Sequence, residues 1–396
     1  MQRQSSTSPS ARPWVAILSA AWVGSRRAAL FASAMVFTLA FGCGGEPEDA
    51  KADAKGDVDA EDTAKTVDAG ADSAGDAADT IGWTVKWTQS APPLPGEAHG
   101  GAIVPGQPGH FVLVGEQAAV AVVTPTGTQL HSIPGAGSAN LHAAYVGANG
   151  EAVVGGSHSV LATGVGDEWQ LVAAIPPTPP ATFRAVDGHG GSVWAVGNDG
   201  VAWRRDDKGV WLSEAVSVTE GAAGAPAAAL PPGADFTAVA VAEAGKVVYV
   251  GVDLGNEGGA LLEKVEGGWR RLALQVAPAQ VWRAPGGVVY LAGGALEPFV
   301  ARWDGAKLEQ LPGLQWSLGF RSVRGAADNL VFFGARKGQL RRFDGKAVSV
   351  VDVAPPVGTP KPFPAPSADL LAVLPHGPDD VLVVTAFYTY RYGLQP

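Results

Sequence analysis

The side chains best suited to chemistry recur at one aligned position of a repeated strand. In the seven copies this position holds Ala102, His142, Arg184, Thr237, Gln280, Arg321 and Leu371. Guanidinium groups hold anions through charge-assisted hydrogen bonds, and His, Thr and Gln add neutral donors and acceptors. If the strands meet around a central opening, His142, Arg184, Thr237, Gln280 and Arg321 would form a ligand site for an anion or a sugar. The alternative is a water-filled channel whose lining binds nothing specific.

The rest of the sequence shows no pattern for a metal site or for catalysis. Seven histidines are scattered, and no pair has the spacing of a metal-binding helix motif. The segment 253–258 carries oxygen ligands but lacks the calcium-loop pattern. His189 lies in a Gly-rich turn and is expected at the surface, whereas Tyr388, Tyr390 and Tyr392 alternate along a strand and are expected to pack on a neighbouring sheet. Without paired carboxylates, a nucleophile elbow or a phosphate loop, we expect no metal, no cofactor and no enzymatic activity.

The aligned residues belong to a repeat in which a short strand, a Gly-rich turn and a hydrophobic run ending at glycine follow one another. Clear copies span 141–155, 183–197, 236–251, 280–293 and 320–334. The closing glycines are Gly115, Gly155, Gly197, Gly251, Gly293 and Gly334, and most lie about 40 to 45 residues apart. One longer gap contains a Pro/Ala/Gly insertion at 221–233. With 53 Gly, 30 Pro and 17% charged residues, the composition indicates a turn-rich, all-β protein.

Each repeat continues with a third and a fourth strand. The third strand, for example 299–303 or 339–343, leads into an Asp-Gly turn, which is a strong hairpin signal because the turn needs positive φ. The fourth strand begins near a tryptophan such as Trp169, Trp211 or Trp269. Four strands in about 40 to 45 residues are typical of one propeller blade.

The last repeat, 370–392, supplies only three strands. The missing fourth strand is expected at the other end of the body, in 83–88, so that the two termini pair and no sheet edge stays exposed. An open solenoid would instead need polar end repeats, and neither terminal segment is polar. The prediction is an all-β, seven-bladed β-propeller over 81–396, closed by its terminal strands.

The N-terminal segment 1–43 has the features of an export signal. It contains four arginines and no acidic residue, and an apolar run from 28 to 42 ends at Cys43, the only cysteine. The run is shorter than the ~20 residues of a membrane-spanning helix, although a non-cleaved anchor is the alternative. Residues 25–30 are similar to a twin-arginine signal. The segment 39–43 resembles the lipobox of bacterial lipoprotein signal peptides, which implies lipidation of Cys43 and a membrane anchor.

The segment 44–80 is an acidic linker. From 44 to 79 it contains twelve acidic residues, three lysines and no aromatic residue. Such a composition cannot bury enough apolar surface to offset the entropy of ordering the backbone, so we expect a disordered tether. With a net charge of −10 and no basic patch, the chain is not expected to bind nucleic acid.

The body from about residue 83 resembles bacterial β-propellers with Trp-Ala-Val-Gly and Asp-Gly-x-x-Trp repeats, distant from Asp-box and kelch propellers. The segments 193–200 and 301–305 carry this resemblance, which implies a fold and no particular activity. The hypothesis is a monomeric, lipid-anchored envelope protein, placed at the outer membrane, that serves as a non-catalytic platform for a protein or polysaccharide partner. The alternative is a secreted or periplasmic carbohydrate-active propeller enzyme of glycosidase or lyase type.

Overall fold

The computed structural model describes part of the unit Ala77–Pro396. The described residues are 88–90, 94–173, 175–176, 179–221, 228–294, 297–312, 318–351, 368–377 and 380–393. The predicted export signal with Cys43, the acidic linker 44–80, residues 83–87 and the Pro-rich stretch 354–367 all lie outside them. Within the described ranges, no helix has the length and apolar character needed to cross a membrane.

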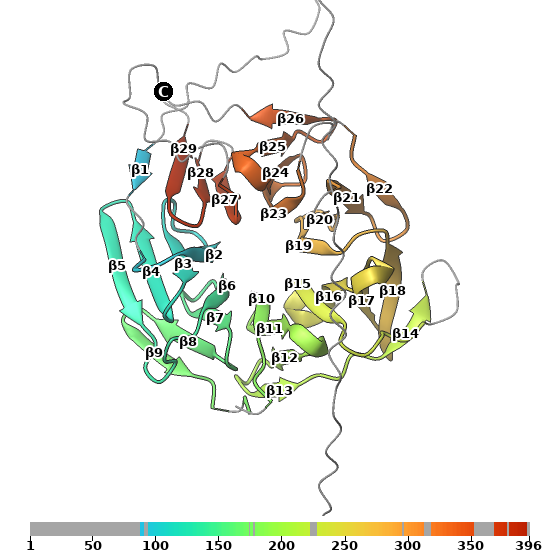
Figure 1. Cartoon of the computed structure of the whole chain (residues 1–396), viewed down its shortest axis with the longest axis horizontal. Coiled ribbons are helices and arrows are strands. Elements are labelled where there is room, and N and C mark those ends of the chain that lie inside the picture. The colour runs from blue at the N-terminus through green and yellow to red at the C-terminus, as the bar shows by residue number, and fades with distance from the viewer. Residues whose placement is uncertain are drawn as a thin grey trace, which may run out of the picture. The chain divides into compact units, whose positions relative to one another are not determined.

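The strands form seven sheets arranged in a ring, and the strand that begins each antiparallel meander lies nearest the centre (Figure 1). Blade 1 contains β2 (Ala98–Ile103), β3 (Phe111–Gly115), β4 (Ala119–Thr124) and β5 (Gly127–Ser132). Blade 2 contains β6 (Leu141–Val146), β7 (Ala152–Gly156), β8 (Leu161–Val165) and β9 (Glu168–Leu171). Blade 3 contains β10 (Phe183–His189), β11 (Ser192–Gly197), β12 (Ala202–Arg205) and β13 (Trp211–Ser213).

The second half of the ring repeats this meander. Blade 4 contains β15 (Asp235–Ala242), β16 (Val247–Asp253), β17 (Gly259–Val265), β18 (Gly268–Leu274) and β14 (Val218–Gly221). Blade 5 contains β19 (Pro278–Arg283), β20 (Val289–Gly293), β21 (Phe299–Trp303) and β22 (Leu308–Gln310). Blade 6 contains β23 (Phe320–Ala327), β24 (Leu330–Ala335), β25 (Leu340–Phe343) and β26 (Val348–Val351). Short 3₁₀ turns occur at η1 (Asn198–Gly200), η3 (Glu243–Gly245), η4 (Gly255–Glu257) and η5 (Arg336–Gly338).

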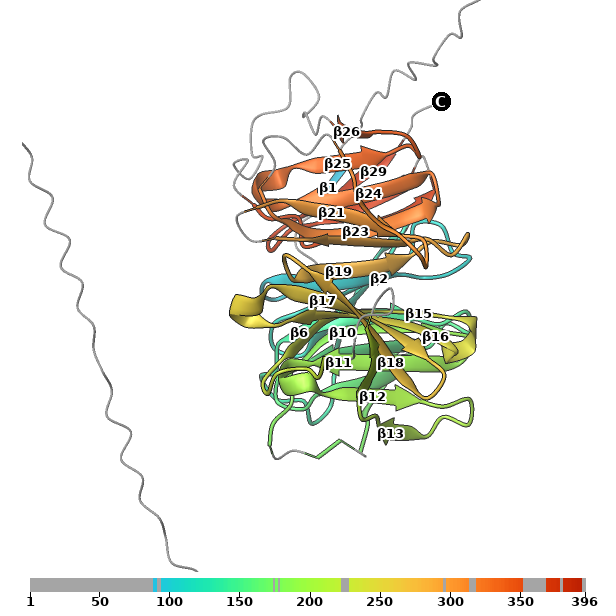
Figure 2. The same cartoon turned by 90° about the vertical axis from the view of Figure 1, so that its right-hand side faces the viewer.

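Blade 7 joins the two ends of the described body. Its sheet order is β1 (Thr88–Ser90), β29 (Thr389–Gly393), β28 (Asp380–Val384) and β27 (Ala372–Gly377). β1 is antiparallel to β29, with Gln89 opposite Tyr390. The predicted seven-bladed, terminally closed propeller is therefore confirmed, although the described closing strand starts at Thr88, where the predicted strand ended. In the side view of Figure 2, β13 of blade 3 and β26 of blade 6 lie at opposite ends of the ring.

Blade 4 has five strands where the sequence predicts four. β14 leaves blade 3 and runs parallel to β18, with Val218 opposite Trp269. A parallel neighbour brought in from the preceding connection covers the outer edge of blade 4, which would otherwise present unpaired backbone groups. The insertion predicted at 221–233 follows this strand, and its residues 222–227 lie outside the described ranges.

The inner strands begin with a bulge, and the recurring glycine has a steric cause there. In β10, Phe183 pairs with Gly197 and Ala185 with Val196, so Arg184 is the extra residue. An added Cβ at Gly197 would collide with the backbone carbonyl of Thr182. Glycines in the same register occur in three other blades, and a Cβ on each would also collide with a carbonyl of the residue before the inner strand: Gly115, Gly156 and Gly293. Glycine is thus required where the partner strand passes close to the bulge.

Buried side chains fill the spaces between successive blades. Trp194 of β11 and Trp269 of β18 are 1% and 2% exposed, and their rings meet edge to face at 5.7 Å. Lys264 lies 4.5 Å over the Trp194 ring and donates a 3.0 Å hydrogen bond to Glu214. This contact joins blades 3 and 4 through an apolar pair with a cation over one face.

The tyrosines of the last strand take the predicted packing role. Tyr390 is 4% exposed and lies in a cluster with Leu330 and Phe332 of the neighbouring blade 6, against which Tyr388 also packs. Burial raises the pKa of Tyr390 to about 12, with a smaller contribution from Tyr388. The predicted packing is therefore confirmed for these two tyrosines, and the side chain of Tyr392 lies outside the described part.

Candidate functional site

A ring of seven side chains surrounds one mouth of the central channel. In six inner strands the residue at the bulge faces this mouth, and in blade 7 the residue just before β27 does so. The seven are His99, His142, Arg184, Thr237, Ala279, Arg321 and Leu371. All of them line a cavity of about 740 Å³, which we call the near mouth. A bulge leaves one residue out of the ladder and turns its side chain, so the same irregularity supplies the site in blade after blade.

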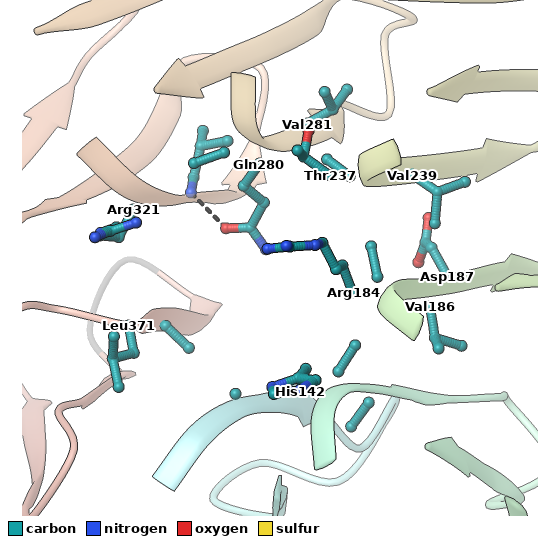
Figure 3. A pocket seen from close by; sticks show the side chains of 18 of the residues that line it. His142, Arg184, Val186, Asp187, Thr237, Val239, Gln280, Val281, Arg321 and Leu371 are labelled. Carbon is teal, nitrogen blue, oxygen red and sulfur yellow. Dashed lines mark hydrogen bonds between the residues drawn. The ribbon is translucent and has the colours of Figure 1, made fainter. Parts of the chain in front are cut away.

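Four of the five predicted ligand residues lie in this ring: His142, Arg184, Thr237 and Arg321. Gln280 is one position away, since Ala279 occupies the bulge of blade 5. The Oε1 of Gln280 instead accepts a 2.7 Å hydrogen bond from the N–H of Val323 and so connects blades 5 and 6. Gln280 still lines the narrow part of the channel, a cavity of about 170 Å³, where Figure 3 shows it between Arg184 and Arg321.

The prediction that Ala102 faces the channel in blade 1 is wrong. Ala102 is 1% exposed and belongs to the core between blades, whereas His99 faces the near mouth. The cause is hairpin length: Ala98 and its partner Gly115 are separated by three more residues than Phe183 and Gly197. The spacing to the closing glycine in the other blades therefore points to Ala102, three residues beyond His99. Blade 1 also lacks the aromatic residue that begins β10, so no sequence signal corrected the alignment.

Two histidines form one side of the near mouth. The rings of His99 and His142 lie 5.4 Å apart with a 49° tilt. The pKa of His142 is lowered to about 4, mainly by burial and to a smaller extent by the nearby His99 and Arg184. His142 is therefore neutral near pH 7. The Nε2 of His99 is buried and has no hydrogen-bond partner among the described residues, so it remains available to a ligand or a water molecule.

Two arginines form the cationic side. The Nε of Arg184 donates to Asn198, and its guanidinium lies 3.6 Å from Asp235. Arg321 lies 3.6 Å from Asp369. Their side chains are 47% and 42% exposed, and neither Asp235 nor Asp369 lines the near mouth. Both arginines therefore line the cavity, and the carboxylates that pair with them do not.

Other groups around this mouth are already engaged. Thr237 donates through its hydroxyl to the carbonyl of Pro278 at 2.5 Å. Asp253 is the one acidic residue among the described lining, and its Oδ1 accepts the N–H of Gly255. The segment 253–258 is therefore an ordinary turn stabilised by its own aspartate, as the sequence predicts. No group of three or more His, Cys, Asp or Glu side chains suited to a metal ion occurs in the described ranges.

His189 is exposed at the other end of the channel. Its Nδ1 accepts a 3.1 Å hydrogen bond from the N–H of Ala244, which connects blades 3 and 4. The expectation of a surface histidine in a turn is confirmed, and its contact is structural.

The chain has no match among family models or curated proteins. Its fold is similar to solved propellers, including Ycf48 from Cyanidioschyzon merolae, with 14% identity and a TM-score of 0.57 over 78% of this chain and 98% of that one. A structure of Ycf48 bound to a D1 peptide is 15% identical, also with a TM-score of 0.57, over 78% and 97% of the two chains. Virginiamycin B lyase from Staphylococcus aureus is 10% identical with a TM-score of 0.61, over 78% and 100%. At these identities the similarity establishes the β-propeller fold alone.

Proposed function

We propose that this protein is a cell-envelope lipoprotein whose β-propeller is a non-catalytic binding platform, and that the near mouth binds an anionic group of a protein or glycan partner. The observation that carries the proposal is the pair Arg184 and Arg321, which both line the cavity, are about half exposed, and are each paired with a carboxylate that does not line it. Guanidinium groups oriented in this way are suited to carboxylates. A neutral His142 and the unpartnered Nε2 of His99 add hydrogen bonds without repelling the ligand.

The chemistry of the mouth favours binding over turnover. A general base works best with a pKa near the working pH, and His142, at about 4, is too weak a base for that task near pH 7. A structural neighbour, Ycf48, is described with a bound D1 peptide, which illustrates peptide binding on this fold.

An exported carbohydrate-active enzyme of glycosidase or lyase type is the second candidate. It is favoured by the similarity to virginiamycin B lyase, whose fold covers the same 78% of the chain. Incubation of the full-length protein with acidic and neutral envelope polysaccharides separates the two: product release supports the enzyme, and saturable binding without products supports the platform.

The membrane anchor is proposed from the sequence around Cys43. Two or three acyl chains would hold the protein stably, because each buried methylene adds about 0.8 kcal/mol and one chain alone is marginal. Fractionation of cells that express Cys43→Ala tests this anchor. We expect the variant in the soluble fraction, and its retention in the membrane fraction would contradict lipid attachment.

The binding role is tested with full-length protein in detergent, titrated with oligogalacturonate and with a peptide that ends in two glutamates. Charge-assisted hydrogen bonds contribute about 1.5 to 3 kcal/mol each, so Arg184→Gln with Arg321→Gln is expected to weaken binding of at least one probe by more than about tenfold. Lys208→Gln with Lys346→Gln removes the same charge from two distant turns and should leave affinity unchanged. Equal affinity in both double variants, or binding of neither probe, would refute the site.

A further inference from the structure

The channel widens again at its opposite end. A cavity of about 1100 Å³ is lined by the later residues of the inner strands, including Tyr145, Asp187, Trp282 and Arg324. We call it the far mouth. It contains none of the seven residues of the near mouth, and it shares Asp187, Trp282 and Arg324 with the narrow part between them. The two ends therefore present different side chains to a ligand.

Asp187 and Arg324 both line this cavity. The Oδ2 of Asp187 accepts a 2.8 Å hydrogen bond from the N–H of Val241. Burial raises the pKa of Asp187, and the nearby Arg324 partly opposes this effect. Among the described residues, however, the two side chains form neither a hydrogen bond nor an ion pair with each other. Both groups keep free hydrogen-bonding capacity, one as an acceptor and the other as a donor.

Two aromatic rings form the walls of the far mouth. The ring of Tyr145 lies against Gly188 of the next blade, where an added Cβ would come within 2.7 Å of Cε1. The ring of Trp282 lies in the same way against Gly325, and an added Cβ there would come within 2.5 Å of Cη2. Trp282 is half-buried and stacks on Tyr290 at 5.8 Å, so a second ring supports it.

The other charged side chains of the far mouth are paired. Arg283 lies 3.4 Å from Glu243, and Arg205 lies 2.6 Å from Glu151. The lining contains three arginines and two acidic residues, and Glu151, the partner of Arg205, lies outside it. Each mouth thus has one more arginine than acidic residues in its described lining, but at the far mouth Arg205 and Arg283 each lie within 3.4 Å of a carboxylate.

We propose that the far mouth is a second binding site and that it takes a neutral saccharide. Sugar hydroxyls can donate hydrogen bonds to Asp187 and accept them from Arg324. The C–H face of the sugar ring fits the apolar faces of Trp282 and Tyr145. A cavity with apolar walls and a few convergent polar groups is the usual form of a small-ligand site. The proposal does not depend on the near mouth or on the lipid anchor.

The test titrates full-length protein with neutral hexasaccharides of glucose (β-1,4 and α-1,4), mannose and N-acetylglucosamine, followed by calorimetry and tryptophan fluorescence. We expect at least one to bind with a Kd of about 1 mM or tighter. Arg324→Gln should weaken that binding about tenfold or more. Trp282→Phe keeps an aromatic wall and should remove most of the fluorescence change while it retains binding. Arg184→Gln with Arg321→Gln, the near-mouth variant, should bind the sugar as the wild type does.

Several results would overturn the proposal. These are no binding of any hexasaccharide, binding that Arg324→Gln leaves intact, or binding lost in the near-mouth variant. A capped, neutral hexapeptide that competes for the same site more strongly than the sugars would assign the far mouth to a peptide. Preferential binding of oligogalacturonate that depends on Arg324 would assign it to an anion.

Discussion

His142 should make the folded protein sensitive to acid in a defined pH range. Its pKa is 6.5 in an unfolded chain and about 4 in the folded ring, so the folded state disfavours the proton. Above pH 6.5 the imidazole is neutral in both the folded and the unfolded state, so it does not lower the stability of the folded state. As the pH falls from 6.5 toward 4, the unfolded state takes up the proton first, and stability is lost.

The size of the effect follows from the shift. A difference of about 2.5 pKa units corresponds to about 3.4 kcal/mol at 1.36 kcal/mol per unit. Since the channel opens to solvent at both mouths, water and ions screen part of this energy, and we expect about 1.5 kcal/mol to remain. That loss should accumulate between pH 6.5 and pH 4.

The assay compares urea unfolding of the wild type and His142→Gln at about pH 7.5 and about pH 4.5. Glutamine is polar and does not titrate, so the stability difference between the two proteins should shift by about 1.5 kcal/mol in favour of the variant at the lower pH. Thr237→Ser is a control on the same ring that retains its hydroxyl and should follow the wild type. A difference that does not change with pH would refute the reasoning, and so would an NMR titration of His142 near 6.5 in the folded protein.

Three further predictions concern the fold. Gly197→Ala should lower the free energy of unfolding, measured by chemical denaturation, by about 2 kcal/mol or prevent folding. Gly127→Ala is the control, because no atom lies within 4 Å of its new Cβ, and it should change this free energy by less than about 0.5 kcal/mol. Equal effects of the two variants would contradict the steric role of Gly197. A chain that stops after Tyr388 lacks β29, so we expect it to associate through the open sheet edge, as measured by light scattering. A chain that stops after Gly393 keeps β29 and should have the same association state as the full chain. Trp194→Ala should cost about 3 to 5 kcal/mol in urea unfolding, and a loss below about 1 kcal/mol would show that the contact between blades 3 and 4 contributes little.

The architecture was predictable because the repeat carries local signals. Asp304 illustrates this: its Oδ1 accepts the N–H groups of Ala306 and Lys307, and Gly305 adopts a φ of 96°, as an Asp-Gly turn requires. β14 was not predictable in the same way. Two of its four residues are exposed and two are half-buried, they show no alternation, and they pair in parallel with a strand about fifty residues later. Such a pairing depends on where the whole of blade 4 lies.

The candidate site was only partly predictable, and the errors follow hairpin length. Arg184 and Arg321 were assigned correctly because a phenylalanine directly before each marks the start of the inner strand. The hairpin of blade 5 shifts the bulge by one residue from Gln280 to Ala279, and that of blade 1 shifts it by three, from Ala102 to His99. A bulge is set by backbone pairing across two strands, so the residue that faces the channel is visible only once the register is known.

The three-residue strand β1 has a mechanical consequence. The polypeptide enters the ring through its pairing with β29, so a pulling force on the segment before Thr88 loads those few hydrogen bonds first. Rupture there would detach β1 while the meanders of the other six blades remain intact. Blade 7 would then be the part of the ring that opens first under tension, and β1 could pair with β29 again when the force is removed.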